Sequence, residues 1–500
     1  MTIALDTACS RRVLFVDLQE VAALDGAEQV VNTATKCPHN PILALGQLDE
    51  WDAMQARPWP GGVMYDPADG LFKMIYSGIG HIRERNWQEG YAESADGINW
   101  VKPRVGRYEW LGSTDNNIVL GNTRGRKDSH STKMRPMLDL AETDPAKRFK
   151  AATKGAPPMR YKVMYSPDAK WWSDPVDVDP DHGLYGGHGI DPCQPLRDDQ
   201  DPDPNRRYKW YGQLIQPTHD GRQHVRKIGL ACGPTLEDLT PSTLNPVLDT
   251  DTGPEDELHF CSVLPYEGHY LMLYEFGRYD DWFHALTGEL RLAVSRNGEQ
   301  FRRLQPHRPI VARGEANEWD AGWIASSSQT IVHDGKIWIF YSGNGSEWKG
   351  WPAQNTPRKF TEDLGVPSSG IVYPSRAGLA TLRLDGFVDV RSIDRLVPAT
   401  VTTVPIAVRE AHERELVVNV GDPEPYRSWV TVEIVDAATG EPLPGYGADD
   451  CQRVLTDGVR LPVRWREHRT LAGVEVERIQ LRFRLYGQAK LYSFAFERAS

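Results

Sequence analysis

The sequence is poor in the features that mark several large classes of protein. Only 6 of its 500 residues are cysteine, and no two of them form a C-x-x-C pair, so we predict neither a zinc module nor any other metal or cofactor site. No dense run of Lys or Arg is present and the formal net charge is −12, which argues against a nucleic acid or an anionic membrane as partner. No apolar run is long enough to span a bilayer.

The N-terminal residues M-T-I-A-L-D-T-A-C-S-R-R lack the basic stretch and apolar core of a secretory signal. The scattered cysteines are typical of reduced, buried side chains. Together these features predict a cytoplasmic protein, and they leave open whether it forms homo-oligomers. A chain of 500 residues is expected to fold as two domains.

What the sequence has in abundance is a repeated unit with aromatic residues. The segments Asp49–Gly78 and Asn317–Gly343 both contain E-W-D-A near their start, pass through a strand of small residues, turn at an Asp/Gly pair and end on Tyr-Ser-Gly. The second half of this unit, a turn followed by an alternating aromatic and aliphatic strand, recurs three more times. Internal repeats of this kind decide the fold before any other signal.

Each repeat predicts a hairpin followed by a further pair of strands, which gives four strands per repeat and five repeats. This pattern is typical of an all-β fold, the five-bladed β-propeller. An irregular sandwich would not explain five similar hairpins in series. We expect residues 1–45 to form a strap outside the blades, and residues 46–395 to form the propeller. Its blades are expected at 46–110, 130–180, 188–245, 255–310 and 318–392.

After Val397 the pattern changes to strict alternation of apolar and polar residues. Val430–Ile434 and Ile479–Leu485 alternate as half-buried antiparallel strands do. We therefore predict that residues 396–500 form a small C-terminal β-sandwich. Two long irregular segments, Trp171–Gly189 and Trp348–Gly370, interrupt the blades, and we expect the second of them to border the active site.

Polar residues just before the first strand of each blade are the candidates for a site, because these strands line the central channel of a propeller. Carboxylates that converge there, with indole rings beside them, suit a sugar substrate. The structural alternative is that such acids cap turns and that tryptophans fill the space between blades. The candidates for substrate binding are Arg57, Trp59, Asp128, His130, His188, Glu255, Trp319, Asp320 and Trp323.

On these residues the chain resembles the five-bladed propeller glycoside hydrolases of families 32, 43 and 68, with relatives in families 117 and 130. The resemblance covers about residues 46–392 and rests on the blade repeats, the S-x-D-G-x-x-W motif at Ser94–Trp100, the Asp191-Pro192 pair and the acidic start of the blade-four strand. It implies that Asp191 orients the sugar and tunes the acid, and that Glu257 is the general acid. Glu255 and Asp256 flank Glu257, so the acid could be any of the three, and Glu257 is chosen because it adjoins the apolar strand.

The third carboxylate that the resemblance implies, a base or nucleophile on blade one, is missing from its usual position. Pro60-Gly61-Gly62 stands there, so Asp52 would have to serve, with Asp320 as its equivalent in the repeated unit. The expected chemistry needs Glu257 protonated by burial and Asp52 ionised beside Arg57.

The leading hypothesis is an exo-acting glycosidase that removes a terminal, furanosyl sugar from a small carbohydrate. One alternative is a phosphorylase similar to family 130, with His130, Lys133 and Arg135 as the phosphate site. Another is a carbohydrate-binding propeller without catalysis, because a fold alone does not fix an activity.

Overall fold

The structure is a computed structural model that describes residues 11–80, 88–121, 133–154, 161–178, 189–217, 219, 221, 224–279, 286–345, 375–408 and 413–498. Within these residues the chain is nearly all β, which confirms the expected class. Strands alternate with turns, and the helical elements found there are three short 3-10 helices: Pro145–Lys147, Pro204–Arg206 and Thr250–Thr252. No helix in this part of the chain is long and apolar enough to cross a membrane.

The chain divides into two compact units. The larger unit comprises residues 34–331 and 338–381, and the smaller unit comprises residues 1–33, 332–337 and 382–500.

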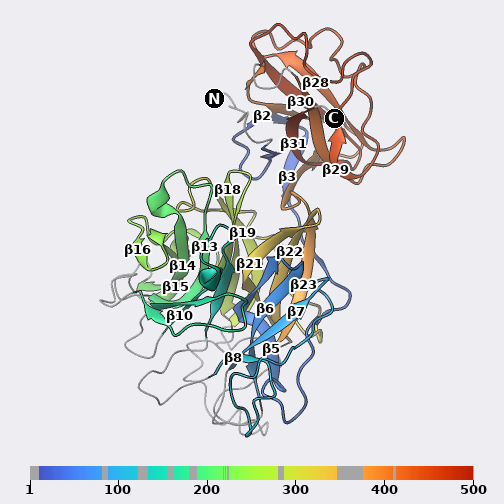
Figure 1. Ribbon diagram of the computed structural model, residues 1–500. Helices are drawn as coiled ribbons and strands as arrows, with labels where there is room; N and C mark the ends of the chain where they lie inside the picture. Colours follow the sequence, from blue (N-terminus) through green and yellow to red (C-terminus); the bar gives the residue numbers. More distant parts are fainter. Residues whose placement is uncertain are drawn as a thin grey trace. The chain divides into compact units, whose positions relative to one another are not determined.

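The larger unit contains five groups of four strands (Figure 1). The first group is β5 (Gln55–Asp66), β6 (Leu71–Ile79), β7 (Gln88–Ser94) and β8 (Ile118–Leu120). The second is β9 (Arg135–Leu138), β10 (Phe149–Lys154), β11 (Tyr161–Ser166) and β12 (Val176–Asp177). The third is β13 (Gly189–Arg197), β14 (Tyr208–Pro217), β15 (His224–Thr235) and β16 (Asp238–Pro241). The fourth is β17 (Glu257–Tyr266), β18 (His269–Tyr279), β19 (Leu286–Ser295) and β20 (Arg302–Leu304). The fifth is β21 (Trp323–His333), β22 (Lys336–Asn344), β23 (Arg376–Arg383) and β4 (Thr35–Lys36).

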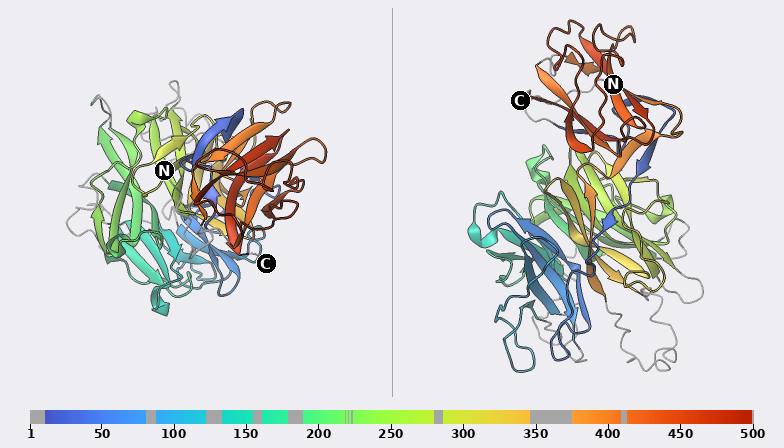
Figure 2. Two further views of the ribbon diagram at one scale, coloured as in Figure 1. Left: turned by 90° about the horizontal axis from the view of Figure 1, so that it is seen from above. Right: turned by 90° about the vertical axis from the view of Figure 1, so that its right-hand side faces the viewer.

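Strand neighbours within the groups are antiparallel, as the hairpin pattern predicted. The second and third groups are separate sheets, whereas the fourth, fifth and first groups join into one twelve-stranded sheet. The joints are single parallel bridges, Gly288 to Trp323 and Arg376 to Ala56. Figure 2 shows these sheets from two further sides.

The first strands of the five groups contact one another through side chains. Gly62 on β5 has no room for a Cβ atom, which would overlap the Ser328 hydroxyl on β21 and lie 3.3 Å from Pro136 on β9. The remaining links are hydrogen bonds: Gln329 Nε2 to Pro136 O (3.1 Å), Arg135 Nε to Pro192 O (2.8 Å), Gln194 Nε2 to Val263 O (3.0 Å), and Ser262 Oγ with Thr330 Oγ1 (3.3 Å).

Three of these first strands are irregular near their starts. The pairing of β5 with β6 shifts between Arg57 and Gly62, that of β17 with β18 shifts between Leu258 and Cys261, and β13 shifts on both sides of Pro192. Bulges of this kind bend a strand and re-aim its side chains, and they are frequent beside active sites.

The smaller unit consists of two sheets that share one apolar core. One sheet orders its strands β29 (Gly458–Pro462), β27 (Arg414–Gly421), β31 (Lys490–Arg498), β24 (Val388–Ser392) and β3 (Ala27–Val31), with β1 (Val13–Leu14) on β31. The other orders β2 (Val21–Asp25), β25 (Ala399–Thr403), β30 (Arg478–Tyr486) and β26 (Ile406–Ala407), with β28 (Trp429–Asp436) on β30. Alternate residues of β30, from Ile479 to Leu485, enter the core, as the alternation predicted.

The N-terminal segment differs from the expected strap. Strands β1, β2 and β3 pair with β31, β25 and β24, so they complete both sheets of the smaller unit. Their apolar residues Val13 and Phe15 lie in its core. Sequence periodicity gives the existence of such short strands but not their distant partners, which is why their place was missed.

Candidate functional site

The E-W-D-A repeats, from which we expected a base or nucleophile, fold into two equivalent hydrogen-bonded structures. Asp52 Oδ2 accepts from the Tyr76 hydroxyl (2.7 Å) and from Lys102 Nζ (2.6 Å), and Trp51 stacks on Tyr76 with ring centroids 5.2 Å apart. We call the set Trp51, Asp52, Tyr76 and Lys102 the first latch.

The second latch repeats this arrangement with Trp319, Asp320, Tyr341 and Lys36. Asp320 Oδ2 accepts from the Tyr341 hydroxyl (2.8 Å) and from Lys36 Nζ (2.7 Å), and the rings of Trp319 and Tyr341 stack at 5.7 Å. Each latch fastens the segment before a first strand to the second strand of the same group.

The latches also explain the Tyr-Ser-Gly end of each repeat. A Cβ atom on Gly78 would overlap the Trp51 ring, and one on Gly343 would overlap Trp319, so only glycine lets the indole lie flat there. The Tyr-Ser-Gly end of each repeat is therefore explained by the packing of the latch. The hydrogen bonds and ion pairs of Asp52 and Asp320 among the described residues go to latch partners, so we do not retain either aspartate as the base.

This reading of the latches predicts matched phenotypes for Asp52→Asn and Asp320→Asn. Each substitution weakens one charge-assisted hydrogen-bonded pair, so we expect each to lower the free energy of unfolding by about 1–3 kcal/mol, measured by chemical denaturation. Turnover per folded molecule should change little and by a similar factor in both variants. A loss of activity above about 100-fold in Asp52→Asn alone, at unchanged stability, would restore Asp52 as a reacting group.

A different set of charged residues converges at the starts of the first strands. Eight of its ten members are buried, Lys133 and Lys154 are partly exposed, and all lie on β5, β7, β9, β10, β13, β15, β17 and β18 or directly before them. We call it the charged cluster: Arg57, Glu89, Lys133, Arg135, Lys154, Asp191, Arg226, Glu257, His259 and Glu275.

Asp191, the residue predicted to orient the sugar, lies between two ammonium groups. Its Oδ2 is 2.6 Å from Lys133 Nζ, and its Oδ1 forms an ion pair with Lys154. Burial opposes ionisation of this carboxyl, but the two lysines outweigh it and hold the pKa of Asp191 well below its usual range. Asp191 is therefore a fixed negative charge.

Glu257, the predicted acid, is the first residue of β17 and forms an ion pair with Arg226 through Oε1. The bulge that follows it brings His259 to the buried carboxyl of Glu275, with Nδ1 3.3 Å from Oε1, and Trp323 Nε1 donates to the same oxygen at 2.6 Å. Burial and then the charge of Glu257 raise the pKa of Glu275 well above its ordinary value. Burial also lowers the pKa of His259, whose ring is therefore neutral.

The predicted substrate residue Arg57 belongs to the charged cluster, while the two tryptophans beside it belong to the core. Its guanidinium lies 4.3 Å from the Trp59 ring centroid, and its Nη1 donates to Ser375 Oγ at 3.0 Å. Burial lowers the pKa of Arg57 to about 9. Trp59 and Trp323 pack edge to face at 5.4 Å and are 3% and 0% exposed, so they form an aromatic floor under the cations instead of an open sugar platform.

Glu89 on β7 was not among the candidates and is the most unusual carboxyl of the cluster. It pairs across the sheet with Ser77, which in turn pairs with Arg57. The side chain is 0% exposed, and no side chain among the described residues donates a hydrogen bond to it. Burial raises its pKa well above the ordinary value, although Arg135, Arg57 and Lys133 act in the opposite direction.

The remaining predicted residues lie elsewhere. Glu255 is bound by Arg303, whose Nε donates to Oε1 at 2.7 Å, and this pair lies next to Tyr274 much as the latch carboxylates lie next to their tyrosines. Trp319 is part of the second latch. Asp128, His130 and His188, and the segment Trp348–Gly370, lie outside the described residues.

Two carboxyls of the cluster, Glu89 and Glu275, were not predicted from the sequence. Both stand inside strands instead of before them. The available signal for Glu275 was a lone charge within the apolar run Y-L-M-L-Y-E-F, whereas Glu89 lies in N-W-Q-E-G-Y-A-E, where no such signal exists. A buried ionisable residue in such a run needs a partner or a function.

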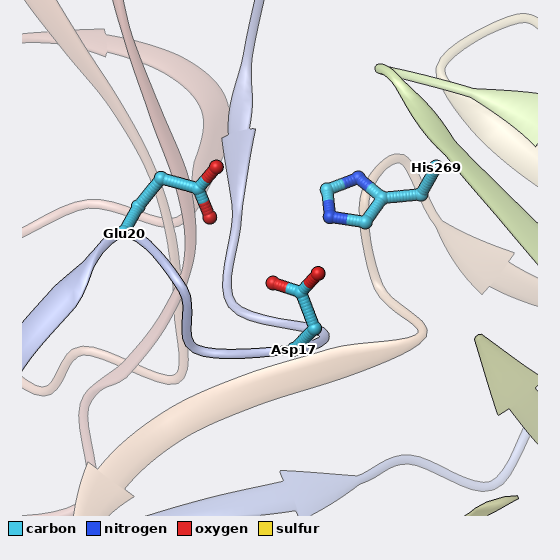
Figure 3. Close-up of side chains that lie close together, drawn as sticks. All are labelled: Asp17, Glu20 and His269. Carbon is cyan, nitrogen blue, oxygen red and sulfur yellow. The ribbon is translucent and has the colours of Figure 1, made fainter. Parts of the chain in front are cut away.

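Figure 3 shows Asp17 and Glu20 on the segment between β1 and β2, and His269 at the start of β18. The two acids belong to the smaller unit and the histidine to the larger one. Asp17 Oδ1 accepts from the backbone of Gln19 at 3.2 Å, and His269 Nδ1 lies 3.0 Å from the carbonyl of Glu267. We assign no metal site to these residues.

No protein-family model matches the chain, and no curated protein matches it. Solved structures similar to it include a glycosyl hydrolase from Bacteroides ovatus, with a TM-score of 0.45 and 12% identity over 71% of this chain and 94% of that one. A β-1,2-mannobiose phosphorylase from Listeria innocua gives 0.44 and 10% over 71% and 98%.

A third similar structure, a fructofuranosidase from Schwanniomyces occidentalis in complex with fructosylnystose, gives a TM-score of 0.42 and 8% identity over 93% of this chain and 99% of that one. Similarity at these TM-scores and identities carries no functional assignment, so the evidence for function is the geometry of the charged cluster.

Proposed function

We propose that the larger unit is a five-bladed β-propeller and the smaller unit a β-sandwich. Five four-stranded antiparallel groups whose first strands contact one another in series support the first part. Two sheets around a single apolar core support the second. In such a propeller the charged cluster would lie at one mouth of the channel.

We further propose that the protein is a cytoplasmic, exo-acting glycosidase that removes a terminal furanosyl unit from a small glycoside. The observation that carries this proposal is the convergence of Asp191, Glu257, Glu275 and Glu89 from four strands, with the pKa of Asp191 lowered and the pKa values of Glu275 and Glu89 raised. Neighbouring carboxyls of unlike protonation are what glycoside hydrolysis requires.

The roles follow from these environments. Glu257 is the proposed general acid, oriented by its ion pair with Arg226 and backed by the protonated Glu275. Asp191, fixed as an anion by two lysines, orients the sugar and stabilises positive charge that develops on it. Glu89 replaces Asp52 as the proposed base, because a carboxyl of raised pKa is a strong base once ionised.

A panel of 4-nitrophenyl and natural furanosides and pyranosides tests the activity, with product sugars identified by NMR. We expect release of a single terminal sugar from at least one furanoside without added phosphate. Release of internal fragments would contradict exo action, and sugar binding without turnover of any member would favour a non-catalytic binding protein.

The phosphorylase alternative keeps support from one observation, the presence of Lys133 and Arg135 next to Asp191. It predicts turnover that depends on orthophosphate and yields a sugar phosphate. Equal rates with and without orthophosphate would exclude it.

A further inference from the structure

The charged cluster contains more cationic groups than its carboxylates neutralise. Its cations are Arg57, Lys133, Arg135, Lys154 and Arg226, whereas Asp191 is the carboxyl that its surroundings hold ionised, because burial raises the pKa values of Glu89 and Glu275 and disfavours their charged forms. Arg226 pairs with Glu257, whereas Lys133 and Lys154 share Asp191. Uncompensated buried charge of this kind costs folding free energy unless a ligand neutralises it.

Arg135 shows this excess most directly. It is 1% exposed, its Nε donates to the carbonyl of Pro192 at 2.8 Å, and it forms no ion pair with any residue that the structure describes. Its terminal Nη2 is buried and has no hydrogen-bond acceptor within the same part of the chain. The central carbon of the guanidinium lies 5.1 Å from the Phe260 ring centroid and 5.8 Å from that of Trp59, so aromatic rings pack against this group.

Lys133 lies two residues from Arg135 on the same segment, and it is the most exposed charged group near it. The Lys133 side chain is 30% exposed, against 11% for Lys154 and 7% for Asp191. Solvent, and hence a ligand, reaches the cluster on the Lys133 side. A planar guanidinium with a neighbouring ammonium is the usual pair of donors for carboxylate, sulfate or phosphate groups.

We propose that Arg135 and Lys133 form a subsite for a small oxyanion, which makes the substrate an anionic one. An oxyanion that suits these donors could be supplied in two ways: as a carboxylate or sulfate group on the sugar, or as free orthophosphate. The proposal specifies the substrate class of the proposed glycosidase. Only the claim that the anion belongs to a sugar substrate rests on that function, because binding of the anion is measured without turnover.

Isothermal titration calorimetry at constant ionic strength tests the subsite, with acetate, sulfate, orthophosphate, glucuronate and galacturonate as probes and glucose and galactose as neutral counterparts. We expect saturable binding of at least one anion at one site per chain. Lys133→Met and Arg135→Met should each weaken it at least tenfold. Lys162→Met removes one charge from the same strand group, where Lys162 pairs with Asp177 outside the cluster, and should leave the affinity unchanged.

The outcomes separate the sources. Binding of a sugar acid but not of its neutral counterpart supports the subsite and places the anion on the glycoside, whereas binding of orthophosphate alone supports it with a free co-substrate. Absence of saturable binding, or equal weakening by all three substitutions, overturns the proposal. A protein that binds the anion but cleaves no glycoside would support this inference and contradict the proposed function. A protein that cleaves a glycoside but binds no anion would support the proposed function and contradict this inference.

The pH dependence of binding gives a second readout. Burial lowers the pKa of Lys133 to about 8, and the groups that face it are Arg135 on β9, Lys154 on β10, Asp191 on β13, Glu89 on β7 and His259 on β17. Asp191 stays ionised and His259 neutral across this range. Affinity should therefore fall up to about tenfold per pH unit above pH 8 in the wild type, and Lys133→Met should flatten this profile between pH 7 and 8.5.

Discussion

Glu257→Gln should lower the rate on a natural glycoside by about 10²–10⁴-fold, while an activated aryl glycoside loses far less. The natural leaving group needs a proton as the glycosidic bond breaks, whereas nitrophenolate leaves without one. Glutamine keeps the size of Glu257 and a hydrogen bond with Arg226, so the difference between the two substrates reports proton donation alone. The measurement is the ratio of kcat/KM for the two substrates in each protein.

The control for this prediction is Glu433→Gln, which removes a buried carboxylate bound by Arg482 and Arg484 in the smaller unit. It should leave the ratio at the wild-type value. Equal losses on both substrates in Glu257→Gln would contradict its role as acid. Glu275→Gln would then be the variant to test, because burial already keeps the Glu275 carboxyl protonated.

Glu89→Gln should abolish turnover to a similar extent, by about 10²–10⁴-fold, without lowering stability at neutral pH. The folded-state pKa of Glu89 is raised above that of the unfolded chain, so the folded protein binds more protons in the interval between the two values. In that interval stability falls as pH rises. Glutamine does not titrate, and the variant escapes this loss.

Two measurements on the same variant check this prediction. Chemical denaturation between pH 5 and 8 should show a flatter stability profile for Glu89→Gln than for the wild type. The acidic limb of the kcat/KM profile, where the base takes up its proton, should disappear from the residual activity. A variant that is destabilised but fully active would instead make Glu89 a structural residue.

Much of the fold could be predicted from the sequence because hairpins are local. Each first hairpin, a turn with its two flanking strands, spans 20 to 29 residues, and the two strands of each predicted hairpin are neighbours in a sheet. The partners of β1, β2 and β3 lie more than 350 residues away along the chain, at β31, β25 and β24. No local pattern encodes pairing across such a distance.

The candidate site could be predicted only in part, for a physical reason. Asp191, Glu257 and Arg57 were found because they stand at strand starts. Asp52 and Asp320 stand at equivalent positions, but each has a tyrosine and a lysine that fold back to it, and sequence spacing does not show those contacts. Strand bulges, which re-aim His259 toward Glu275, are likewise set by packing in three dimensions.

The pairing of the N-terminal strands with the last hundred residues has a consequence for biosynthesis. Strand β3 leaves the ribosome about 360 residues before its partner β24, a delay of roughly 20–70 s at about 5–20 residues per second. Over that interval the run Val13-Leu14-Phe15-Val16 has no sheet to join. Unpaired apolar strands of this kind are sites where aggregation starts, so we expect this run to be prone to aggregation until its partner strands are made.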